Sequence, residues 1–499
     1  MERIEGQTHQ TKQCDETSMK DKVLISVASK EGIVEFAKAL KGLHFDIIAT
    51  GGTQKLLQEN GVEAIKISDY TGGSESDRVK TLSRRIAKEI LETGEIGLVI
   101  CNLYPFFAQK GKSLDEMVEF VDIGGVTLIR AAAKNYKQVG VVYDPKQYNE
   151  IIEHIKDNTF TPEFRLNLAR RAFDYIAWYD TVIAEYFSSD FMEREYFSAA
   201  AEKFISLRHG ENPHQKAAFF LDRLHQEDFI IHGGKQISYN NIIDAEVAIG
   251  TAHEFIDEIA CVVIKHQTPC CVALGDTQAE AFERAYMADS ISAFGGIVGL
   301  NRSVEEETAE LIRSHFFEVI IAPAYEKKAL EILKTKQNVR IIEVSPRLTH
   351  PVVYKPVFGG ILVQERDQAD FENWEVVTKR APNDYETETL KFAWKVVKWT
   401  KSNSVVFAVK GRTVGIGAGQ TSRIGAVEIA LRQSVQRSAG VVMASDGFFP
   451  FRDSIDAVAK GGVTAVIQPG GSLRDQEVIE ACNEQGMAMV FTHMRHFKH

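Results

Sequence analysis

Residues 22–57 read KVLISVASKEGIVEFAKALKGLHFDIIATGGTQKLL and contain one pattern twice. Each copy begins with a short apolar run, at 23–27 and 45–49, which is typical of a buried β-strand. A small polar loop follows each run, and then an amphipathic stretch such as 33–40, whose apolar residues recur at helical spacing. Two strand–loop–helix units in succession predict a parallel sheet flanked by helices, and therefore an α/β fold.

The same alternation continues along the chain. Residues 97–101, GLVIC, predict a further buried strand of this sheet. A long helical stretch from about Pro162 to Phe187 most simply links this part to the rest. From about Ser198 onward strands and helices alternate again, without a repeat of fixed period. Because 499 residues exceed one ordinary domain, we expect two domains, at 20–195 and 196–499.

Composition narrows the class of protein. The chain is 44% hydrophobic and 25% charged, as soluble globular proteins are. Its net charge of −11 argues against a nucleic-acid-binding protein with a broad basic face. The six cysteines form no Cys/His cluster, so we expect reduced thiols and no metal site. The polar first 20 residues and the lack of an 18-residue apolar run predict a cytoplasmic protein without a signal peptide or membrane anchor.

The loops after the first two strands are candidates for phosphate binding. Ser26, Lys30 and the turn Thr50-Gly51-Gly52-Thr53 can present hydroxyls and backbone N–H groups to a phosphate at helix N-termini. Ordinary strand-to-helix turns, in which glycine and threonine serve geometry and capping, have the same pattern. Neither loop is a Walker A or a G-x-G-x-x-G sequence.

Two later segments add charged groups. Arg78-Val79-Lys80-Thr81 places two cations and a hydroxyl together. Asp122 precedes Gly124-Gly125 at the entrance of a predicted helix that leads to Lys134. An N-cap and a solvated helix lysine would have this pattern too, so the residues alone leave a structural role open.

The C-terminal part holds a denser set of polar motifs. Lys265-His266 ends a strand run and precedes Pro269, so we expect both side chains at a strand end, where α/β sheets commonly place chemistry. A neutral histidine accepts a proton near neutral pH, and an adjacent lysine stabilises negative charge and helps to keep the imidazole unprotonated. A structural hydrogen-bonding role is the alternative for any single histidine. Polar loops at 207–215, 238–241 and 292–296 in the same domain favour a site.

These motifs follow the order found in the bifunctional purine-biosynthesis enzymes. From Ser26 to Asn135 they resemble the IMP cyclohydrolase domain of that family, which has a methylglyoxal-synthase-like fold. From Arg208 to His499 they resemble its AICAR transformylase domain, a larger α/β region built from cytidine-deaminase-like subdomains. The resemblance implies a homodimeric enzyme that transfers a formyl group from 10-formyltetrahydrofolate to AICAR and cyclises formyl-AICAR to IMP.

The resemblance also implies roles for single residues. His266 would deprotonate the 5-amino group of the nucleotide, and Lys265 would stabilise the charge that develops on the formyl oxygen. Ring closure with loss of water would use Lys80, Tyr104, Asp122 and Lys134. The residues expected to bind nucleotide or folate are Ser26, Lys30, Thr50, Gly51, Gly52, Thr53, Arg78 and Thr81 in the N-terminal domain, and Arg208, Asn240, Phe294, Gly295, Asn403, Arg423, Phe448, Phe449 and Arg495 in the C-terminal domain.

The N-terminal domain departs from the family pattern. After Lys80-Thr81-Leu82 the chain has Ser83-Arg84-Arg85 where the family has His-Pro and a glycine-containing stretch, and the segment up to Asn102 is shorter. The first loop has Ala28-Ser29 in place of Ser-Asp. A narrower function is therefore the alternative: a transformylase whose cyclohydrolase domain is impaired by the altered 80–83 segment.

Three departures lie in the C-terminal domain. His209 stands where the family commonly has tyrosine, Thr268 where it has asparagine or serine, and Cys271 where it has glycine. A β-carbon at Cys271 is expected to strain the backbone beside the base. Lys265-His266 is intact, which opposes a third class of function, a nucleotide-binding regulatory protein without turnover.

Overall fold

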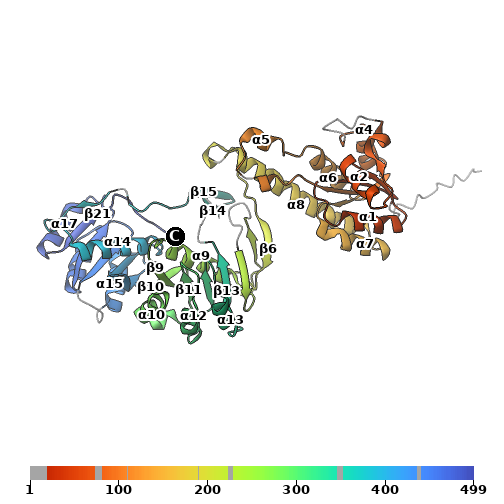
Figure 1. Ribbon diagram of the computed structural model, residues 1–499. Coiled ribbons are helices and arrows are strands. Elements are labelled where there is room, and N and C mark those ends of the chain that lie inside the picture. The colour runs from red at the N-terminus through yellow and green to blue at the C-terminus, as the bar shows by residue number, and fades with distance from the viewer. Residues whose placement is uncertain are drawn as a thin grey trace, which may run out of the picture. The chain divides into compact units, whose positions relative to one another are not determined.

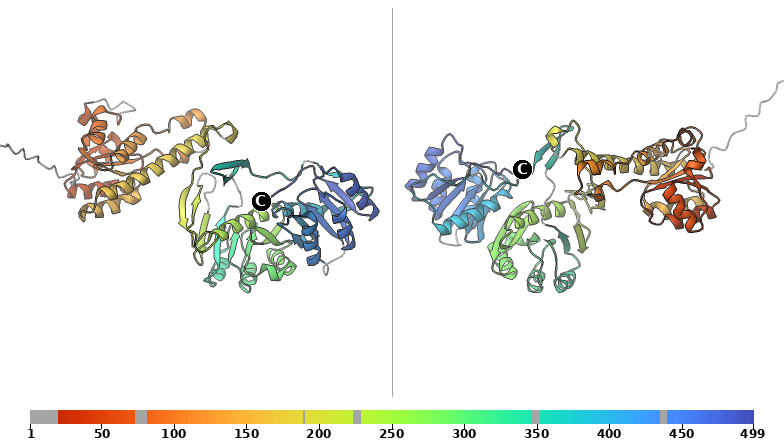
Figure 2. Two further views of the ribbon diagram at one scale, coloured as in Figure 1. Left: turned by 180° about the vertical axis from the view of Figure 1, so that it is seen from behind. Right: turned by 45° about the horizontal axis from the view of Figure 1, so that its top comes forward.

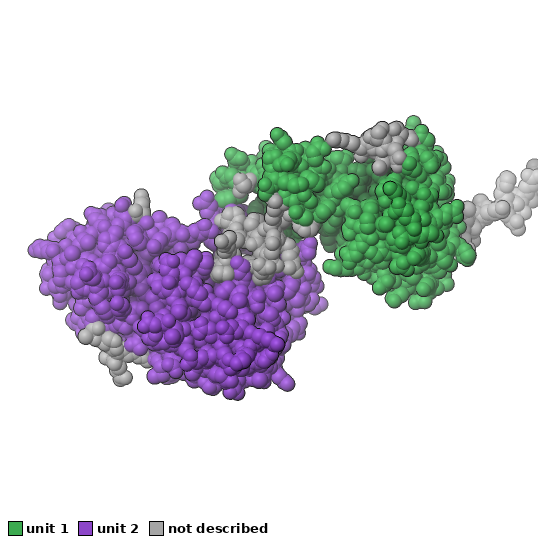
Figure 3. All heavy atoms as spheres, in the orientation of Figure 1, with its two compact units in different colours: residues 1–201 green, residues 202–499 purple. Residues whose placement is uncertain are grey.

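The computed structural model describes residues 20–72, 81–109, 111–188, 190–222, 229–345, 352–371, 373–434 and 440–499. The chain forms two compact units, which divide after Ala201 (Figure 3). Unit 1 comprises the residues up to Ala201, and unit 2 comprises Glu202–His499.

Unit 1 contains a five-stranded sheet in which all neighbouring strands are parallel. The order is β3 (Ile65–Lys66), β2 (Asp46–Ala49), β1 (Lys22–Val27), β4 (Ile96–Asn102) and β5 (Gly140–Val142). Every residue of β4 is buried, as expected of a parallel strand covered on both faces. The strands predicted at 23–27, 45–49 and 97–101, and their parallel arrangement, are confirmed.

Helices cover this sheet (Figures 1 and 2). They are α1 (Ile33–Gly42), α2 (Gly51–Glu59), α3 (Ile67–Thr71), α4 (Arg84–Leu91), α5 (Leu114–Val118), α6 (Gly124–Lys134), α7 (Tyr148–Lys156) and α8 (Pro162–Phe187). α8 packs on α6 and β5, and it buries Leu168, Ala172, Ile176 and Tyr179 at helical spacing. The long helix therefore belongs to the core of unit 1, and it also leads toward the boundary after Ala201.

Unit 2 contains a twelve-stranded mixed sheet whose two halves repeat one arrangement. In chain order the first half has β8 (Phe229–Gly233), α9 (Tyr239–His253), β9 (Ile259–Lys265), β10 (Thr268–Gly275), α10 (Gln278–Ala288), α11 (Ser290–Ala293), β11 (Ile297–Leu300), α12 (Glu306–Arg313), β12 (Val319–Ala322), α13 (Lys327–Lys334) and β13 (Arg340–Val344). The second half has β16 (Glu375–Val376), α14 (Asp384–Lys398), β17 (Val405–Val409), β18 (Arg412–Gly417), α15 (Arg423–Ser434), β19 (Val441–Ser445), α16 (Asp453–Lys460), β20 (Val463–Gln468), α17 (Asp475–Glu484) and β21 (Ala488–Phe491).

The spatial order of strands repeats as well. The sheet runs β10-β9-β11-β12-β13-β8 in the first half and β18-β17-β19-β20-β21-β16 in the second, and the halves meet where β10 pairs antiparallel with β18. Each half joins one antiparallel hairpin to three parallel strands. Two further hairpins complete the unit: β6 (Glu202–Ser206) with β7 (Ala218–Leu221), and β14 (Val352–Val357) with β15 (Gly360–Glu365). The sequence showed no repeat because the halves share an order of elements and not a fixed residue period.

Candidate functional site

In unit 1 the loops after β1, β2 and β4 lie at one edge of the sheet, because these strands are parallel neighbours. Asn102, the last residue of β4, holds the loop after β1. Its Oδ1 accepts hydrogen bonds from the backbone N–H groups of Ala28 at 2.6 Å and Ser29 at 2.9 Å, and its Nδ2 donates to the Ser29 carbonyl at 3.2 Å. The sequence interpretation gave Asn102 no role, although a polar residue directly after a predicted buried strand is a candidate site residue.

Lys30 connects the loops after β1 and β2. Its Nζ donates to Thr53 Oγ1 at 2.8 Å and also to the Val27 carbonyl, and burial lowers the pKa of Lys30. The Thr50 hydroxyl donates to the same Thr53 oxygen at 3.4 Å, and the two glycines between them form the first turn of α2. The structure therefore brings Lys30, Thr50 and Thr53 together, with Gly51 and Gly52 in the turn between the two threonines, while Ser26 lies in β1 just before the first loop.

Asp122 lies where the chain enters α6. Its Oδ1 accepts from the Gly125 backbone N–H at 2.6 Å and its Oδ2 from that of Tyr104 at 3.4 Å, while its own N–H donates to the Tyr179 hydroxyl at 3.0 Å. Burial raises the pKa of the Asp122 carboxyl, and the two N–H donors only partly offset this. The Tyr104 side chain is 54% exposed, so Asp122 and Tyr104 form one partly open site.

The hydroxyl of Thr81 also lies at the start of α6. A β-carbon at Gly124 would come within 2.2 Å of Thr81 Oγ1, so the threonine packs directly against the first residue of α6. Arg78 and Lys80, which the sequence assigned to binding and catalysis, lie outside the described residues.

The departure at Ser83-Arg84-Arg85 begins a helix. Ser83 caps α4, its Oγ accepting from the Arg85 backbone N–H at 3.2 Å. The Arg85 guanidinium pairs with Glu89 at 2.9 Å and lies over the Tyr70 ring at 3.9 Å. These contacts give Ser83 and Arg85 structural roles.

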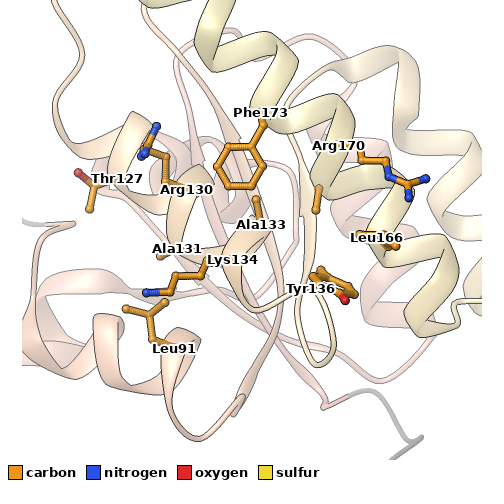
Figure 4. Close-up of a pocket in the computed structure, with 11 residues that line it drawn as sticks. Leu91, Thr127, Arg130, Ala131, Ala133, Lys134, Tyr136, Leu166, Arg170 and Phe173 are labelled. Atoms are coloured by element: carbon orange, nitrogen blue, oxygen red, sulfur yellow. The ribbon is translucent and has the colours of Figure 1, made fainter.

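Lys134 lies at the other end of α6. Ten helical steps of 1.5 Å separate it from the start of α6, about 15 Å along the axis. It lines a groove of about 610 Å³ formed by α4, α6 and α8, together with Leu91, Arg130, Arg170 and Phe173 (Figure 4). Within one chain the structure does not bring Lys134 to Asp122.

In unit 2, Lys265 is the last residue of β9, which confirms the predicted strand end. The next element is a strand rather than a helix: His266 and Gln267 form a two-residue turn into the antiparallel β10. Lys265 Nζ donates to the Phe294 carbonyl at 3.0 Å and lies 3.5 Å from that of Ser292, while the His266 side chain is exposed.

A carboxylate that the sequence interpretation missed holds this turn. Asp244 of α9 accepts from the backbone N–H of His266 at 3.2 Å and from that of Gln267 at 2.7 Å. Burial raises the pKa of Asp244, whereas these N–H groups and the charges of His266 and Lys401 lower it in part. Asp244 precedes His266 by 22 residues, and no sequence pattern links the two.

The predicted residues Phe294 and Gly295 lie next to Lys265. Gly295 has a φ of 71° and donates its N–H to the Phe316 carbonyl at 3.0 Å. The Phe294 ring is 63% exposed and lies 5.2 Å from the Phe316 ring. Two aromatic faces therefore lie beside the lysine, open to a planar ligand.

The loop that carries Arg208 is seated on the start of α9, the helix that carries Asp244. Asn240 Nδ2 donates to the Glu211 carbonyl at 3.2 Å, and the Arg208 backbone N–H donates to the Ile237 carbonyl at 2.8 Å. The Arg208 side chain is exposed, so its guanidinium is available to an anion.

Arg423 and Asn403 form a second cluster. The Arg423 guanidinium is buried, pairs with the fully buried Asp446, and donates to Asn403 Oδ1 at 2.9 Å. Asn403 Nδ2 donates to the Gln420 carbonyl at 2.9 Å. Arg423 is thus engaged inside the protein and supports Asn403.

Phe448 and Phe449 point to different environments. Phe448 is 41% exposed, whereas Phe449 is completely buried in the hydrophobic core of the second half. The expectation that Phe449 lines a ligand site is wrong for this arrangement, because its ring contacts core residues.

The C-terminal segment is anchored around Arg495. His496 is buried, with its ring nitrogens 2.7 Å from Asp367 Oδ2 and 2.9 Å from the Asp370 carbonyl. The Ser402 backbone N–H donates to the Lys498 carbonyl at 2.9 Å, and the Lys498 backbone N–H donates to Ser402 Oγ at 3.1 Å, next to Asn403. Arg495 itself is exposed, with its guanidinium 4.6 Å from the Phe497 ring.

The three C-terminal departures cause no backbone strain. Cys271 lies in β10 without a positive φ, so the expected strain from its β-carbon is wrong: an extended strand accommodates it. Burial raises the pKa of the neighbouring Cys270 thiol to about 12, which keeps it protonated. Thr268 begins β10, and His209 Nδ1 lies 2.8 Å from the Gly210 carbonyl.

Within the described ranges, no group of three or more His, Cys, Asp or Glu side chains is arranged to hold a metal ion. No helix in the same part of the chain has the length and apolar character to cross a bilayer.

Comparison with known proteins gives two family matches. Residues 132–433 match the family described as AICARFT/IMPCHase bienzyme, and residues 32–127 match the MGS-like domain. A bifunctional purine biosynthesis protein PurH of Thermoanaerobacter sp. (strain X514) is 46% identical over 510 residues, covering 96% of this chain and 100% of its own length. PurH proteins of Persephonella marina (strain DSM 14350 / EX-H1) and Aquifex aeolicus (strain VF5) are 46% and 45% identical over 96% of this chain and over 99% and 100% of their own. A solved structure of ForH is 32% identical, with 34% of this chain and 97% of ForH covered and a TM-score of 0.31.

Proposed function

The chain belongs to the AICARFT/IMPCHase bienzyme family, and from that premise we propose which of its residues carry the two reactions. It is a bifunctional enzyme of purine biosynthesis, with AICAR formyltransferase and IMP cyclohydrolase activities. The full-length relatives support both activities, so the alternative of a transformylase alone is set aside.

The lysine–histidine pair at the β9–β10 turn carries the formyl-transfer proposal. The 5-amino nitrogen of AICAR attacks the formyl carbon of 10-formyltetrahydrofolate, an N–C bond forms, and the bond to N10 of the folate breaks. The exposed His266 imidazole accepts the amine proton, and a proton passes to N10 as tetrahydrofolate leaves. The Lys265 ammonium, held at 3.0 Å from the Phe294 carbonyl, stabilises the oxyanion that forms on the way.

The residues around this pair bind the two substrates. Arg208 and Arg495 expose guanidinium groups that suit the nucleotide phosphate. Asn240, Gly295 and Asn403 supply polar groups and close backbone approach, and the exposed rings of Phe294 and Phe448 take the planar parts of nucleotide and folate. Arg423 acts through Asn403, to which it donates at 2.9 Å.

Asp122 and Tyr104 carry the proposal for cyclisation. The carboxamide nitrogen of formyl-AICAR attacks the formyl carbon, the ring closes, and water leaves. A carboxyl whose pKa is raised can deliver a proton to the departing hydroxyl. The phosphate would sit among Ser26, Lys30, Thr50, Gly51, Gly52, Thr53 and Thr81. From the resemblance alone, Arg78 would add to binding and Lys80 to ring closure.

Lys134 can take part in the proposed ring closure only if the protein is an oligomer. Because it lies about 15 Å along α6 from the helix start, its role in ring closure requires a homodimer in which it faces Asp122 of the partner subunit. We accordingly propose a cytoplasmic homodimer whose ligands are the nucleotide and the folate, not nucleic acid or membrane.

The test uses the two reactions as each other's control. In His266→Ala, formyl transfer from 10-formyltetrahydrofolate should fall at least about 100-fold, since the general base is lost. The same variant should bind AICAR in a calorimetric titration and convert supplied formyl-AICAR to IMP at the parental rate, followed by absorbance. Near-parental formyl transfer would remove His266 from the proposed role.

A further inference from the structure

The turn that presents His266 has an unusual backbone for its residues. His266 and Gln267 have φ values of 55° and 62°, and both are in the left-handed region. Two-residue hairpin turns with positive φ at both positions favour Asn-Gly, because a β-carbon is disfavoured there. Neither position has glycine, so something else must hold the turn.

The second half of the sheet contains the corresponding turn. Lys410-Gly411 connects β17 to β18 with the same two-residue length, and its positive φ of 62° falls on glycine. The Lys410 backbone N–H donates to the Tyr385 hydroxyl of α14 at 3.3 Å, as the His266 N–H donates to Asp244 of α9. Each half thus supports its turn from the equivalent helix, and only the first half lacks glycine at the turn.

We propose that Asp244 is a positioning residue for formyl transfer, whose carboxylate holds the His266-Gln267 turn in its left-handed conformation and so fixes the imidazole in place. The inference rests on the role proposed above for His266. Two backbone N–H groups donate to the two oxygens of one half-buried carboxylate, and hydrogen bonds to an ionised acceptor are the stronger kind. The imidazole, Lys401 and the Cys270 thiol also interact electrostatically with this carboxylate.

The first variant is Asp244→Asn in the full-length enzyme. The amide keeps the size of the side chain, but it turns one acceptor oxygen into an NH₂ group that faces an N–H donor. We expect kcat for formyl transfer to fall about 100-fold, the effect of a misplaced reacting group, with KM for AICAR changed less than about threefold. Asp257→Asn, at an exposed acid after α9, is the matched control and should behave as the parent.

The second experiment tests whether another substitution restores the kcat lost in Asp244→Asn. Gln267→Gly makes the turn His-Gly, which needs less external support because glycine adopts the positive φ of the second position without strain. The double variant Asp244→Asn/Gln267→Gly should therefore recover at least about tenfold of the lost kcat. Gln267→Gly alone should stay within about twofold of the parent. Gln267→Val, which places a β-branched residue at positive φ, should lower kcat with Asp244 intact.

The outcomes distinguish a positioning role of Asp244 from a role in packing alone. Parental kcat in Asp244→Asn overturns the inference, and so does a loss that Gln267→Gly fails to restore, which would assign Asp244 to packing of α9. Unchanged cyclisation of supplied formyl-AICAR confirms that the rest of the enzyme is intact. If His266→Ala itself stays active, the proposed function of the histidine has failed, independently of Asp244.

Discussion

The Asp122 carboxyl is buried while it accepts two backbone hydrogen bonds, and burial prevails, since its pKa is raised. A group with a raised folded-state pKa binds its proton more tightly in the folded protein than in the unfolded chain. As the pH rises above the unfolded pKa, this carboxyl therefore lowers the free energy of unfolding, and the destabilisation disappears at low pH, where the carboxyl is protonated in both states.

Asp122→Asn removes the charge and keeps an acceptor for Gly125. The melting temperature of unit 1 in the variant, relative to the parent, should therefore rise as the pH increases from about 4 to about 7, around and above the unfolded pKa of about 3.9. Calorimetry at the two pH values measures this. If the difference in melting temperature between variant and parent became smaller with increasing pH, the predicted destabilisation by the ionised Asp122 would be wrong. Independently of its stability, the variant should lose cyclisation.

Among the elements, the entry of α6 is the most tightly built. A β-carbon at Gly125 would lie 2.7 Å from Leu103 Cδ2 and 2.9 Å from both Asp122 carboxylate oxygens. Gly125→Ala should therefore destabilise unit 1 by about 1–3 kcal/mol and lower cyclisation, because the crowded side chain is the proposed acid.

Gly42→Ala is the control for that variant, since a β-carbon there meets nothing within 4 Å at the last residue of α1. It should be neutral or slightly stabilising. Denaturant unfolding monitored together with IMP formation compares the two. Equal stability of both variants would show that the entry of α6 tolerates a side chain.

The sequence predicted the elements whose apolar pattern is continuous. β4 is buried at every position and β1 nearly so, which is why both were visible as apolar runs. The two-residue β3 and β16 have too few residues for any period. The contact of Asp244 with the His266 turn depends on how α9 packs on β9, and a burial pattern carries no information about that partner.

For the whole molecule, we expect the two activities to reside in different units, since unit 1 and unit 2 are each compact. Removal of residues 495–499 deletes Arg495 and the buried His496, whose ring lies 2.7 Å from Asp367 and whose centroid lies 4.9 Å from that of Trp394. Formyl transfer should fall by at least about 100-fold through loss of the phosphate contact and of the anchor. Cyclisation of supplied formyl-AICAR should remain parental, and its loss would show that unit 1 depends on this segment.

The anchored C-terminal segment also sets an order of events during synthesis. Ribosomes deliver the chain from its N-terminus, so unit 1 can fold while unit 2 is still being translated. Residues 495–498 emerge after every strand of the large sheet, yet Lys498 hydrogen-bonds to Ser402, almost a hundred residues earlier. With the sites assigned as proposed, the formyl-transfer site can therefore form only after residues 495–498 have been synthesised, later than unit 1 can fold.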